Sequence, residues 1–263
     1  MLINGAQGNL ISIRDRGLLY GDGVFRTLLV VHGRPQHWPL HYQKILHDCT
    51  ALGIVCPDEN LLSAELTGLA LQHPDAVFKL IVTRGQAVRG YSPLACTAAT
   101  HLWDVAPLPV YPDQGVTLGL CALRLGHQPR LAGIKHLNRL ENVLAAAECT
   151  DFAEGLLLDA DGLVIEGVRS NVFLVSGGRL ITPDLSRCGV AGVERDRVIA
   201  CAGQMGIAVD MRDVELDELR AADELFLTNS VFGLWSVAQF EERRWTDFSF
   251  AVRIRAALAG ELD

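Results

Sequence analysis

The chain has 263 residues, 49% of them hydrophobic and 21% charged, which is ordinary for a globular protein with one large domain or two modest ones. Its formal net charge of −8 argues against a nucleic-acid partner, which would require clustered basic residues. No apolar run approaches the roughly 18 residues of a membrane-spanning helix, and the first residues lack the pattern of a signal peptide, so we expect a cytoplasmic protein without a membrane partner.

The seven cysteines are scattered along the chain and form no Cys-x-x-Cys pair. An odd number without such spacing argues against a disulfide framework and against a zinc site. We therefore expect most of them to be small buried apolar residues in a reducing compartment, and we expect no metal.

The first half of the chain predicts strands and two helices around one Gly-rich loop. In chain order, the pattern gives a strand pair over 1–4 and 10–13, a strand over 24–32, helices over 39–52 and 57–73, a strand over 76–83, the loop over 84–92 and a strand over 100–106. Three prolines then interrupt the pattern within 107–113. We expect a linker there, between an N-terminal α/β domain (1–106) and a C-terminal α/β domain (114–263).

The second half predicts more strands, several of them in hairpins. The expected elements are a strand over 116–123, a helix that follows Lys135 directly, a hairpin of 155–159 and 163–166 around Asp161-Gly162, strands over 172–175 and 179–181, a helix over 192–205, strands over 208–214 and 224–228, and a helix over 248–258. Helices alternating with hairpins favour an α/β protein with mixed sheets over a doubly wound parallel fold.

Only three of the 23 Lys and Arg residues are lysines, so chemistry that needs an uncharged amine has three candidates. Lys79 lies in a strand and Lys44 on a helix, where a solvated surface position is a sufficient interpretation. Lys135 lies between an apolar residue and the predicted helix, whose dipole would lower the pKa of an ammonium near its N-terminus. A lysine that forms a Schiff base requires a lowered pKa, although this placement alone leaves a structural role open.

A phosphorylated aldehyde cofactor on Lys135 would need an acidic partner and an anion site. Glu166 ends an otherwise apolar strand, although a surface position would also explain it. The segment 189–194 (GVAGVE) precedes a helix, and free backbone N–H groups at a helix start bind phosphate. Each signal is weak by itself, and neither matches the dinucleotide or Walker patterns.

Several separated segments together carry a specific resemblance. They are 15–16, 20–25 (YGDGVF), 83–92 (TRGQAVRGYS), 132–141 (AGIKHLNRLE), 166–173 (EGVRSNVF), 192–195 (GVER) and 228–235 (TNSVFGLW). In this order they resemble the fold-type IV pyridoxal 5′-phosphate (PLP) enzymes over almost the full chain. The segments 83–92 and 228–235 are more similar to the aminodeoxychorismate lyases than to the branched-chain and D-amino-acid aminotransferases.

The resemblance implies a two-domain, D-amino-acid aminotransferase-like fold with PLP between the domains, usually in a homodimer. It implies that Lys135 binds PLP as a Schiff base and that Glu166 pairs with the pyridinium nitrogen. It further implies that the amides of Val193 and Glu194 hold the phosphate together with the hydroxyl of Ser230. Asn229, which precedes Ser230, is a further cofactor-binding candidate.

The chain departs from the family pattern at two positions. The family usually has an arginine for the phosphate in a His-x-x-Arg pattern, where this chain has His41 and Lys44. A lysine keeps the charge and loses the bidentate fork, so Lys44 becomes a candidate phosphate ligand that binds as a point charge. Ser236 stands where many members have proline.

For a lyase, the resemblance implies the conversion of 4-amino-4-deoxychorismate to 4-aminobenzoate and pyruvate, a step of folate synthesis. Lys135 would remove the proton from the amine-bearing carbon, and Lys135 or Thr27 would protonate the leaving group. Arg89, Tyr91 and Arg26 are candidate anchors for the two substrate carboxylates, although a surface role explains each arginine equally well.

Other functions stay open at this point. A branched-chain or D-amino-acid aminotransferase would use the same lysine and glutamate, and the segment 228–235 is the feature that favours the lyase. A non-catalytic PLP carrier would release no pyruvate. A protein that shares only the fold would bind no cofactor.

Overall fold

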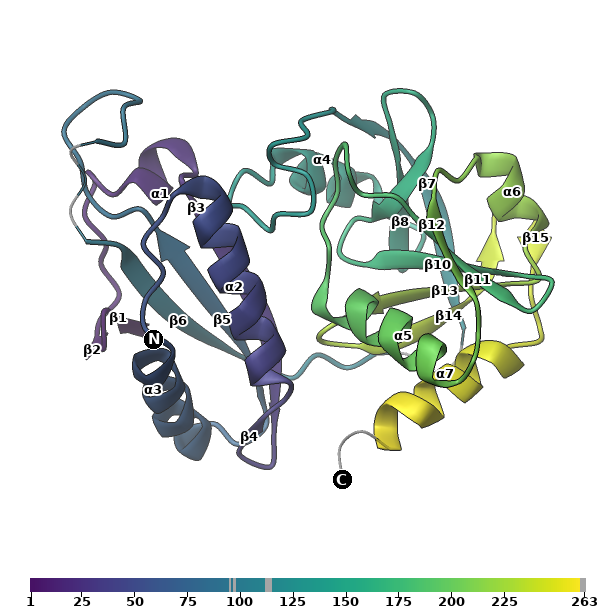
Figure 1. The fold of residues 1–263 in the computed structure, drawn as a ribbon, viewed down its shortest axis with the longest axis horizontal. Coiled ribbons are helices and arrows are strands. Elements are labelled where there is room, and N and C mark those ends of the chain that lie inside the picture. The colour runs from purple at the N-terminus through teal and green to yellow at the C-terminus, as the bar shows by residue number, and fades with distance from the viewer. Residues whose placement is uncertain (95, 97, 112–114, 261–263) are drawn as a thin grey trace. The chain divides into compact units, whose positions relative to one another are not determined.

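The computed structural model describes residues 1–94, 96, 98–111 and 115–260, which form two compact units (Figure 1). The first unit comprises Met1–Val110 with Ile134–Asn138, and the second comprises Tyr111–Gly133 with Arg139–Asp263. By its contacts, the segment that carries Lys135 therefore groups with the first unit, although the proline-based boundary assigns it to the C-terminal domain. Residues 112–114, where the predicted linker ends and the predicted C-terminal domain begins, lie outside the described residues.

A six-stranded antiparallel sheet forms the first unit, with the strand order β2-β1-β6-β5-β3-β4. Its strands are β1 (Leu2–Ile3), β2 (Ala6–Gln7), β3 (Gly23–Val31), β4 (Arg34–Pro35), β5 (Ala76–Thr83) and β6 (Thr100–Pro107). Its helices are α1 (Arg16–Tyr20), α2 (Trp38–Leu52) and α3 (Glu59–Gln72).

One face of this sheet is covered by α2 and α3. Ile45 from α2 and Leu62 from α3 share a buried core with Val24 and Leu28 from β3. Because side chains alternate along a strand, Arg26 points to the face that the helices cover, whereas Phe25 and Thr27 point to the other face. The alternation decides which candidate side chains can meet.

The second unit is built on a nine-stranded mixed sheet with the order β12-β11-β10-β13-β14-β7-β8-β9, in which β15 also pairs with β14. Its strands are β7 (Val116–Leu125), β8 (Glu154–Asp159), β9 (Val164–Gly167), β10 (Asn171–Ser176), β11 (Arg179–Pro183), β12 (Val209–Arg212), β13 (Glu224–Asn229), β14 (Gly233–Phe240) and β15 (Arg243–Arg244). Its helices are α4 (Leu140–Glu148), α5 (Val193–Gln204), α6 (Leu216–Ala221) and α7 (Ser249–Ala259).

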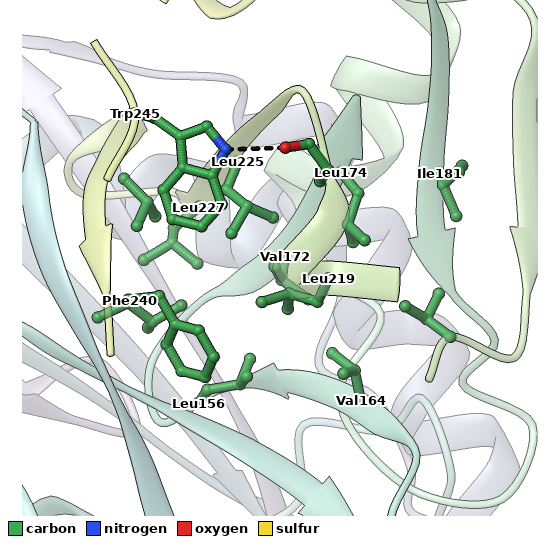
Figure 2. Packing of buried hydrophobic residues seen from close by; sticks show 14 of the residues in the cluster. Leu156, Val164, Val172, Leu174, Ile181, Leu219, Leu225, Leu227, Phe240 and Trp245 are labelled. Carbon is green, nitrogen blue, oxygen red and sulfur yellow. Dashed lines mark hydrogen bonds between the residues drawn. The ribbon is translucent and has the colours of Figure 1, made fainter. Parts of the chain in front are cut away.

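The sheet of the second unit curls around an apolar core (Figure 2). Leu156 and Val164, from β8 and β9 at one end of the strand order, pack in the same cluster as Val172 and Ile181, from β10 and β11 near the other end. Trp245 closes the cluster and donates its Nε1–H to a backbone carbonyl 2.9 Å away. On the opposite face, α5 and α7 pack in a second core with Phe173 and Phe226, whose rings stack at 5.1 Å.

Most predicted elements are confirmed, including the strand over 76–83 and the hairpin around Asp161-Gly162. Several predictions were wrong or incomplete, and the short helices α1 and α6 were not predicted. The segment 10–13 is not a strand, because β1 pairs instead with β2. The strand β14 was missed. The helix after Lys135 begins only at Leu140, so Lys135 lies outside the first turn, where a helix dipole acts.

Among the described residues, no helix is long and apolar enough to cross a membrane.

Candidate active site

Lys135 lies on a short segment that runs beside β3 in the first unit. The amide of Phe25 donates to the carbonyl of Lys135 at 2.9 Å, and the amide of Leu137 donates to the carbonyl of Gly23 at 2.9 Å. Ile134, immediately before the lysine, is buried in the core of this unit. The strand therefore fixes the lysine's backbone, which the argument from a helix dipole did not anticipate.

A buried acid on α2 holds the other side of the same peptide. Asp48 is fully buried (0% exposed), and its Oδ2 accepts a hydrogen bond from the backbone N–H of Lys135 at 3.2 Å. The same oxygen pairs with the guanidinium of Arg26, which is only 2% exposed. Nothing in the sequence pattern singles out Asp48, because it lies 87 residues before the lysine that it contacts.

The side chain of Lys135 lies over the ring of Phe25, with Nζ 4.9 Å from the ring centroid. The Nζ of Lys79 lies 4.8 Å from the centroid of the same ring. In the pairing of β3 with β5, Lys79 stands directly opposite Thr27. Both lysines, Phe25 and Thr27 are therefore brought together on the face of the sheet that α2 and α3 leave uncovered.

Lys79 is thus a candidate residue that the sequence interpretation set aside as a solvated strand residue. It is half-buried, on the same side of β5 as Val77 and Ile81. The sequence did contain a signal for Lys79, because side chains along a strand alternate between its two faces. Lys79 alternates with the buried Phe78 and Leu80, so it must lie on the other face, together with the side chain opposite it on β3.

The predicted substrate anchors occupy different surroundings. Arg89 and Tyr91 lie exposed in the loop after β5, with Tyr91 85% exposed. Arg26 lies on the opposite face of β3 from Thr27, against Asp48. Arg26 is therefore linked to the backbone of Lys135 by Asp48, which contacts both residues. It is buried, unlike Arg89, which is exposed.

In the second unit, Glu166 lies on β9 and is 3% exposed. Its Oε2 accepts a hydrogen bond from the backbone N–H of Val190 at 2.8 Å. Gly189, with φ +84°, leaves room there, since a Cβ on it would lie 2.8 Å from a methyl of Ile165. The two oxygens of a carboxylate offer several acceptor sites, and the N–H of a protonated pyridine is a donor that such a group accepts.

Asn171 ties the loop before α5 to the sheet. Its side-chain amide donates to the carbonyl of Val190 at 2.8 Å, and its oxygen accepts from the amide of Gly192 at 3.2 Å. A Cβ on Gly192 would lie 2.5 Å from that oxygen, so the close approach requires glycine. Asn171 was quoted in the sequence motif but was not assigned a role there.

The start of α5 has the character of an anion site. Gly192 is its N-cap and provides no side-chain hydrogen bond to the first turn, which begins with Val193 and Glu194. Ser170 precedes Asn171, which binds the amide of Gly192, and Thr228 stands opposite Asn171 in the sheet; among the described residues, the buried hydroxyls of Ser170 and Thr228 have no hydrogen-bond partner. A helix N-terminus whose cap is glycine, together with hydroxyl donors, fits a phosphate group.

The turn after β13 is shaped by Asn229. Its side-chain oxygen accepts hydrogen bonds from the amides of Val231 and Phe232, both at 2.9 Å, and its amide donates to the carbonyl of Arg169 at 3.2 Å. Ser230 lies at the first position of this turn. The side chain of Asn229 is therefore committed to the backbone that carries Ser230.

Lys44 lies half-buried on α2 in the first unit, whereas Val193, Glu194 and Ser230 belong to the second. Likewise, Lys135 and Glu166 are held by separate units. Each unit presents its own half of the predicted set.

One cluster of potential metal ligands lies elsewhere in the second unit. The donor atoms of His127, Asp159 and Cys188 lie within 4.8 Å of one another. Burial raises the pKa of the Cys188 thiol to about 12, and His127 already lies 2.9 Å from an oxygen of Asp159. The guanidinium of Arg187 lies 3.8 Å from an oxygen of Asp159, where it already balances that charge. We therefore assign no metal to this cluster.

Comparison with known proteins gives one consistent result. The family described as amino-transferase class IV matches residues 23–240. An aminodeoxychorismate lyase of Vibrio harveyi is 35% identical over 90% of this chain and 89% of its own length. A putative branched-chain-amino-acid aminotransferase of Methanocaldococcus jannaschii is 32% identical over 89% of this chain and 83% of its own length.

Among solved structures, the 4-amino-4-deoxychorismate lyase of Pseudomonas aeruginosa is 44% identical to this chain. It superposes with a TM-score of 0.95 over 100% of this chain and 99% of its own. This likeness confirms the predicted fold-type IV architecture.

Proposed function

Because this chain belongs to the amino-transferase class IV family, we propose that it is a PLP-dependent aminodeoxychorismate lyase, which converts 4-amino-4-deoxychorismate to 4-aminobenzoate and pyruvate. The observation that carries this proposal is the likeness to the Pseudomonas aeruginosa lyase, at 44% identity over the full chain. The reaction is an elimination. PLP supplies the electron sink that lets the substrate lose a proton from carbon, so the reaction does not require a metal.

The residues of the second unit fit the two ends of PLP. Glu166, buried and held by the amide of Val190, would pair with the pyridine nitrogen and keep its proton in place. The amides of Val193 and Glu194 and the hydroxyl of Ser230 would hold the phosphate, and Asn229 would hold the turn. Lys44 would add a positive charge from the first unit.

In the first unit, Lys135 is the amine that would anchor the cofactor and then move the proton from the amine-bearing carbon of the substrate. Its backbone is fixed through Phe25 and Asp48, so the side chain pivots from a rigid base. Thr27, on the same face, would supply the proton for the departing pyruvate.

The substrate carries two carboxylates, and cations on the same face as Lys135 suit them. Lys79 meets this condition, because it stands opposite Thr27 and beside the ring of Phe25. Arg89 and Tyr91 on the neighbouring loop are the further candidates. For Arg26 we propose a different role, since it is buried against Asp48 and would hold that carboxylate.

We also propose that the protein forms a homodimer. Three large apolar side chains of α4 are exposed on one side of the helix, Leu140 by 76% and Val143 and Leu144 by 60% each. Their i, i+3, i+4 spacing forms a continuous stripe of the kind that a second copy covers. Sedimentation of wild type and of Leu144→Asp tests this: the variant is expected to sediment as a monomer, and an unchanged dimer would exclude this stripe as the interface.

An aminotransferase of the same fold is the second candidate, favoured by the 32% identity to the Methanocaldococcus jannaschii protein. A carrier that binds PLP without turnover is the third. One experiment separates them: purified protein is supplied with aminodeoxychorismate, or with a branched-chain or D-amino acid and 2-oxoglutarate, and the products are measured.

The lyase is expected to release pyruvate and 4-aminobenzoate in equal amounts, and Lys135→Ala is expected to release neither. Glutamate formation without pyruvate would assign the aminotransferase. A yellow protein that forms neither product would be assigned as a PLP carrier. A colourless protein would show that the chain does not bind PLP.

A further inference from the structure

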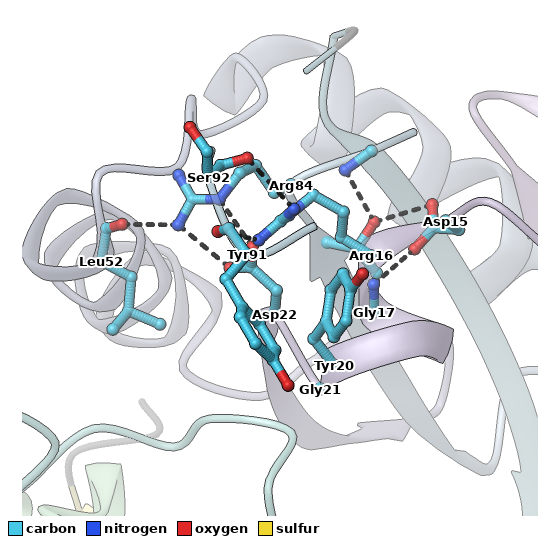
Figure 3. A network of polar contacts seen from close by, with 12 residues as sticks. Asp15, Arg16, Gly17, Tyr20, Gly21, Asp22, Leu52, Arg84, Tyr91 and Ser92 are labelled. Carbon is cyan, nitrogen blue, oxygen red and sulfur yellow. Dashed lines mark hydrogen bonds and ion pairs between the residues drawn. The ribbon is translucent and has the colours of Figure 1, made fainter. Parts of the chain in front are cut away.

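A guanidinium in the first unit binds three consecutive carbonyls of one loop (Figure 3). Arg16 is 4% exposed, and its Nη1 donates to the carbonyls of Gly90 at 2.9 Å and Ser92 at 3.3 Å. Its Nη2 donates to the carbonyl of Tyr91 at 2.9 Å. A planar fork with fixed N–H directions can satisfy three carbonyls in this way, whereas a lysine ammonium has no such geometry.

Arg16 is itself held in place by an acid shared with a second arginine. Its Nε donates to Asp22 at 2.7 Å, and Arg84 donates to both oxygens of Asp22 at 2.8 and 3.0 Å. Burial raises the pKa of Asp22, but the hydrogen bonds from Arg84 and Arg16 outweigh it and hold the pKa below the usual value. Arg84 also donates to the carbonyls that end α2, at Leu52 and Gly53. The network therefore links the loop to a rigid helix end.

The tyrosine at the end of α1 binds the same loop. The hydroxyl of Tyr20 accepts from the amide of Gly90 at 3.2 Å, and its ring lies 5.3 Å from that of Tyr91. The guanidinium of Arg16 lies 4.9 Å from the centroid of the Tyr20 ring. Gly90 has φ +117°, a conformation that turns its N–H and C=O toward these two partners and that other residues rarely adopt.

Backbone hydrogen bonds at Gly85 and Ala87 hold the base of the loop, whereas its tip exposes its side chains. Val88 and Tyr91 are exposed, and so is Arg89 between them. No apolar side chain among these three anchors the loop in the core of the unit. Without Arg16, the carbonyls of 90–92 would turn to water at small cost to the fold, because Asp22 would keep its two bonds from Arg84.

We propose that Arg16 is a positioning residue for the reaction: by fixing the backbone of 90–92 it sets Arg89 and Tyr91 in the orientation that receives a carboxylate of the substrate. The substrate part of this inference rests on the proposed function, whereas the ordering of the loop does not. Arg16 acts through the loop and needs no contact with the substrate.

The test compares Arg16→Gln and Arg16→Lys with Arg14→Gln as the control, since Arg14 is an exposed arginine two residues away. Amide hydrogen exchange is measured on the PLP-loaded protein for peptides over 85–92 and, as an internal reference, for peptides of β5. Steady-state kcat and KM for pyruvate release are measured on the same preparations.

Both Arg16 variants are expected to exchange about tenfold faster over 85–92 with β5 unchanged, because several charge-assisted hydrogen bonds are lost. We expect KM to rise about tenfold and kcat to change by less than about threefold, as for lost substrate positioning. Arg14→Gln is expected to match wild type in every measurement.

Unchanged exchange over 85–92 in Arg16→Gln would overturn the proposal, and so would equal acceleration in β5, which would mean a general structural role. Faster loop exchange with unchanged KM would also overturn it. If wild type releases no pyruvate, the proposed function fails, and KM for an amino-acid donor then decides the substrate part while the exchange decides the ordering of the loop.

Discussion

Replacing Asp48 with alanine is expected to weaken the first unit and the hold on Lys135 together. The change removes a fully buried carboxylate, and with it the negative charge that pairs with the guanidinium of Arg26, which is 2% exposed. Removing one member of a buried ion pair costs about 3–5 kcal/mol. Against the roughly 5–15 kcal/mol that stabilises a typical fold, this is a large fraction, and for a unit of this size it lowers Tm by about 12 °C or more.

A double variant separates the cost of losing one member of the buried ion pair from the role of the acid beside Lys135. In Arg26→Met with Asp48→Leu, no charge is left buried, so stability is expected to return to within about 1 kcal/mol of wild type. The backbone N–H of Lys135 still lacks its acceptor at 3.2 Å. We therefore expect stability to recover in the double variant and turnover to stay low.

Unfolding in urea is monitored by the hydrogen exchange of peptides from α2, because these peptides report on the first unit separately. Asp210→Ala is the matched control, because Asp210 forms a surface ion pair with Arg179 and such pairs contribute about 0–1 kcal/mol. The reasoning would be refuted if Asp48→Ala were no more destabilising than Asp210→Ala. Full recovery of turnover in the double variant would remove Asp48 from the positioning of Lys135.

Three further predictions concern the cofactor site and the loop network. Lys44→Ala is expected to lose PLP on dialysis at least about tenfold faster than wild type, and Lys44→Arg to retain it, because a charge-assisted bond to the phosphate is removed only in the first; equal retention in both would exclude Lys44 from the site. Gly192→Ala is expected to weaken PLP binding, because its Cβ would lie 2.5 Å from Asn171 Oδ1. In the control variant Gly203→Ala, near the end of the same helix, the Cβ meets no atom within 4 Å, and the change is expected to stabilise the protein by about 0.4–1 kcal/mol. PLP titration and thermal unfolding of both variants measure these effects. The pKa of Asp22 is lowered in the folded state, so its contribution to stability is complete above its ordinary value of 3.8 and disappears as pH falls through the lower folded value; urea unfolding between pH 2 and 5 is expected to show a shallower acid loss in Asp22→Asn, and parallel curves would contradict this.

The sequence predicts local elements well where burial is one-sided. The strand over 76–83 alternates between buried and half-buried residues, and its bounds follow from that alternation. In β14, four consecutive residues from Leu234 to Val237 are buried, but Ser236 interrupts the apolar run of the kind that marks the equally buried β10 and β13. In α4 the apolar spacing predicts a helix, but Leu137 fits the same spacing although the helix begins only at Leu140, so the predicted start is too early.

The candidate site was predictable where one residue type is rare or a motif is contiguous, as for Lys135 and the segment before α5. It was not predictable where the partner is distant in sequence. The contact between Asp48 and the Lys135 amide and the contacts between Arg16 and residues 90–92 join segments 87 and 74–76 residues apart. Composition and spacing carry no information about such pairs, because the sheet and its helices bring them together only on folding.

The central claim is that Lys135, among the three lysines of the chain, is the one that binds PLP. Borohydride reduction of the PLP-loaded protein fixes the cofactor covalently to its lysine, and tryptic peptides then identify the position by mass. We expect one pyridoxyl group per chain, on the peptide of residues 131–139, and none in Lys135→Ala. A pyridoxyl group on Lys44 or Lys79, or none in wild type, would contradict it.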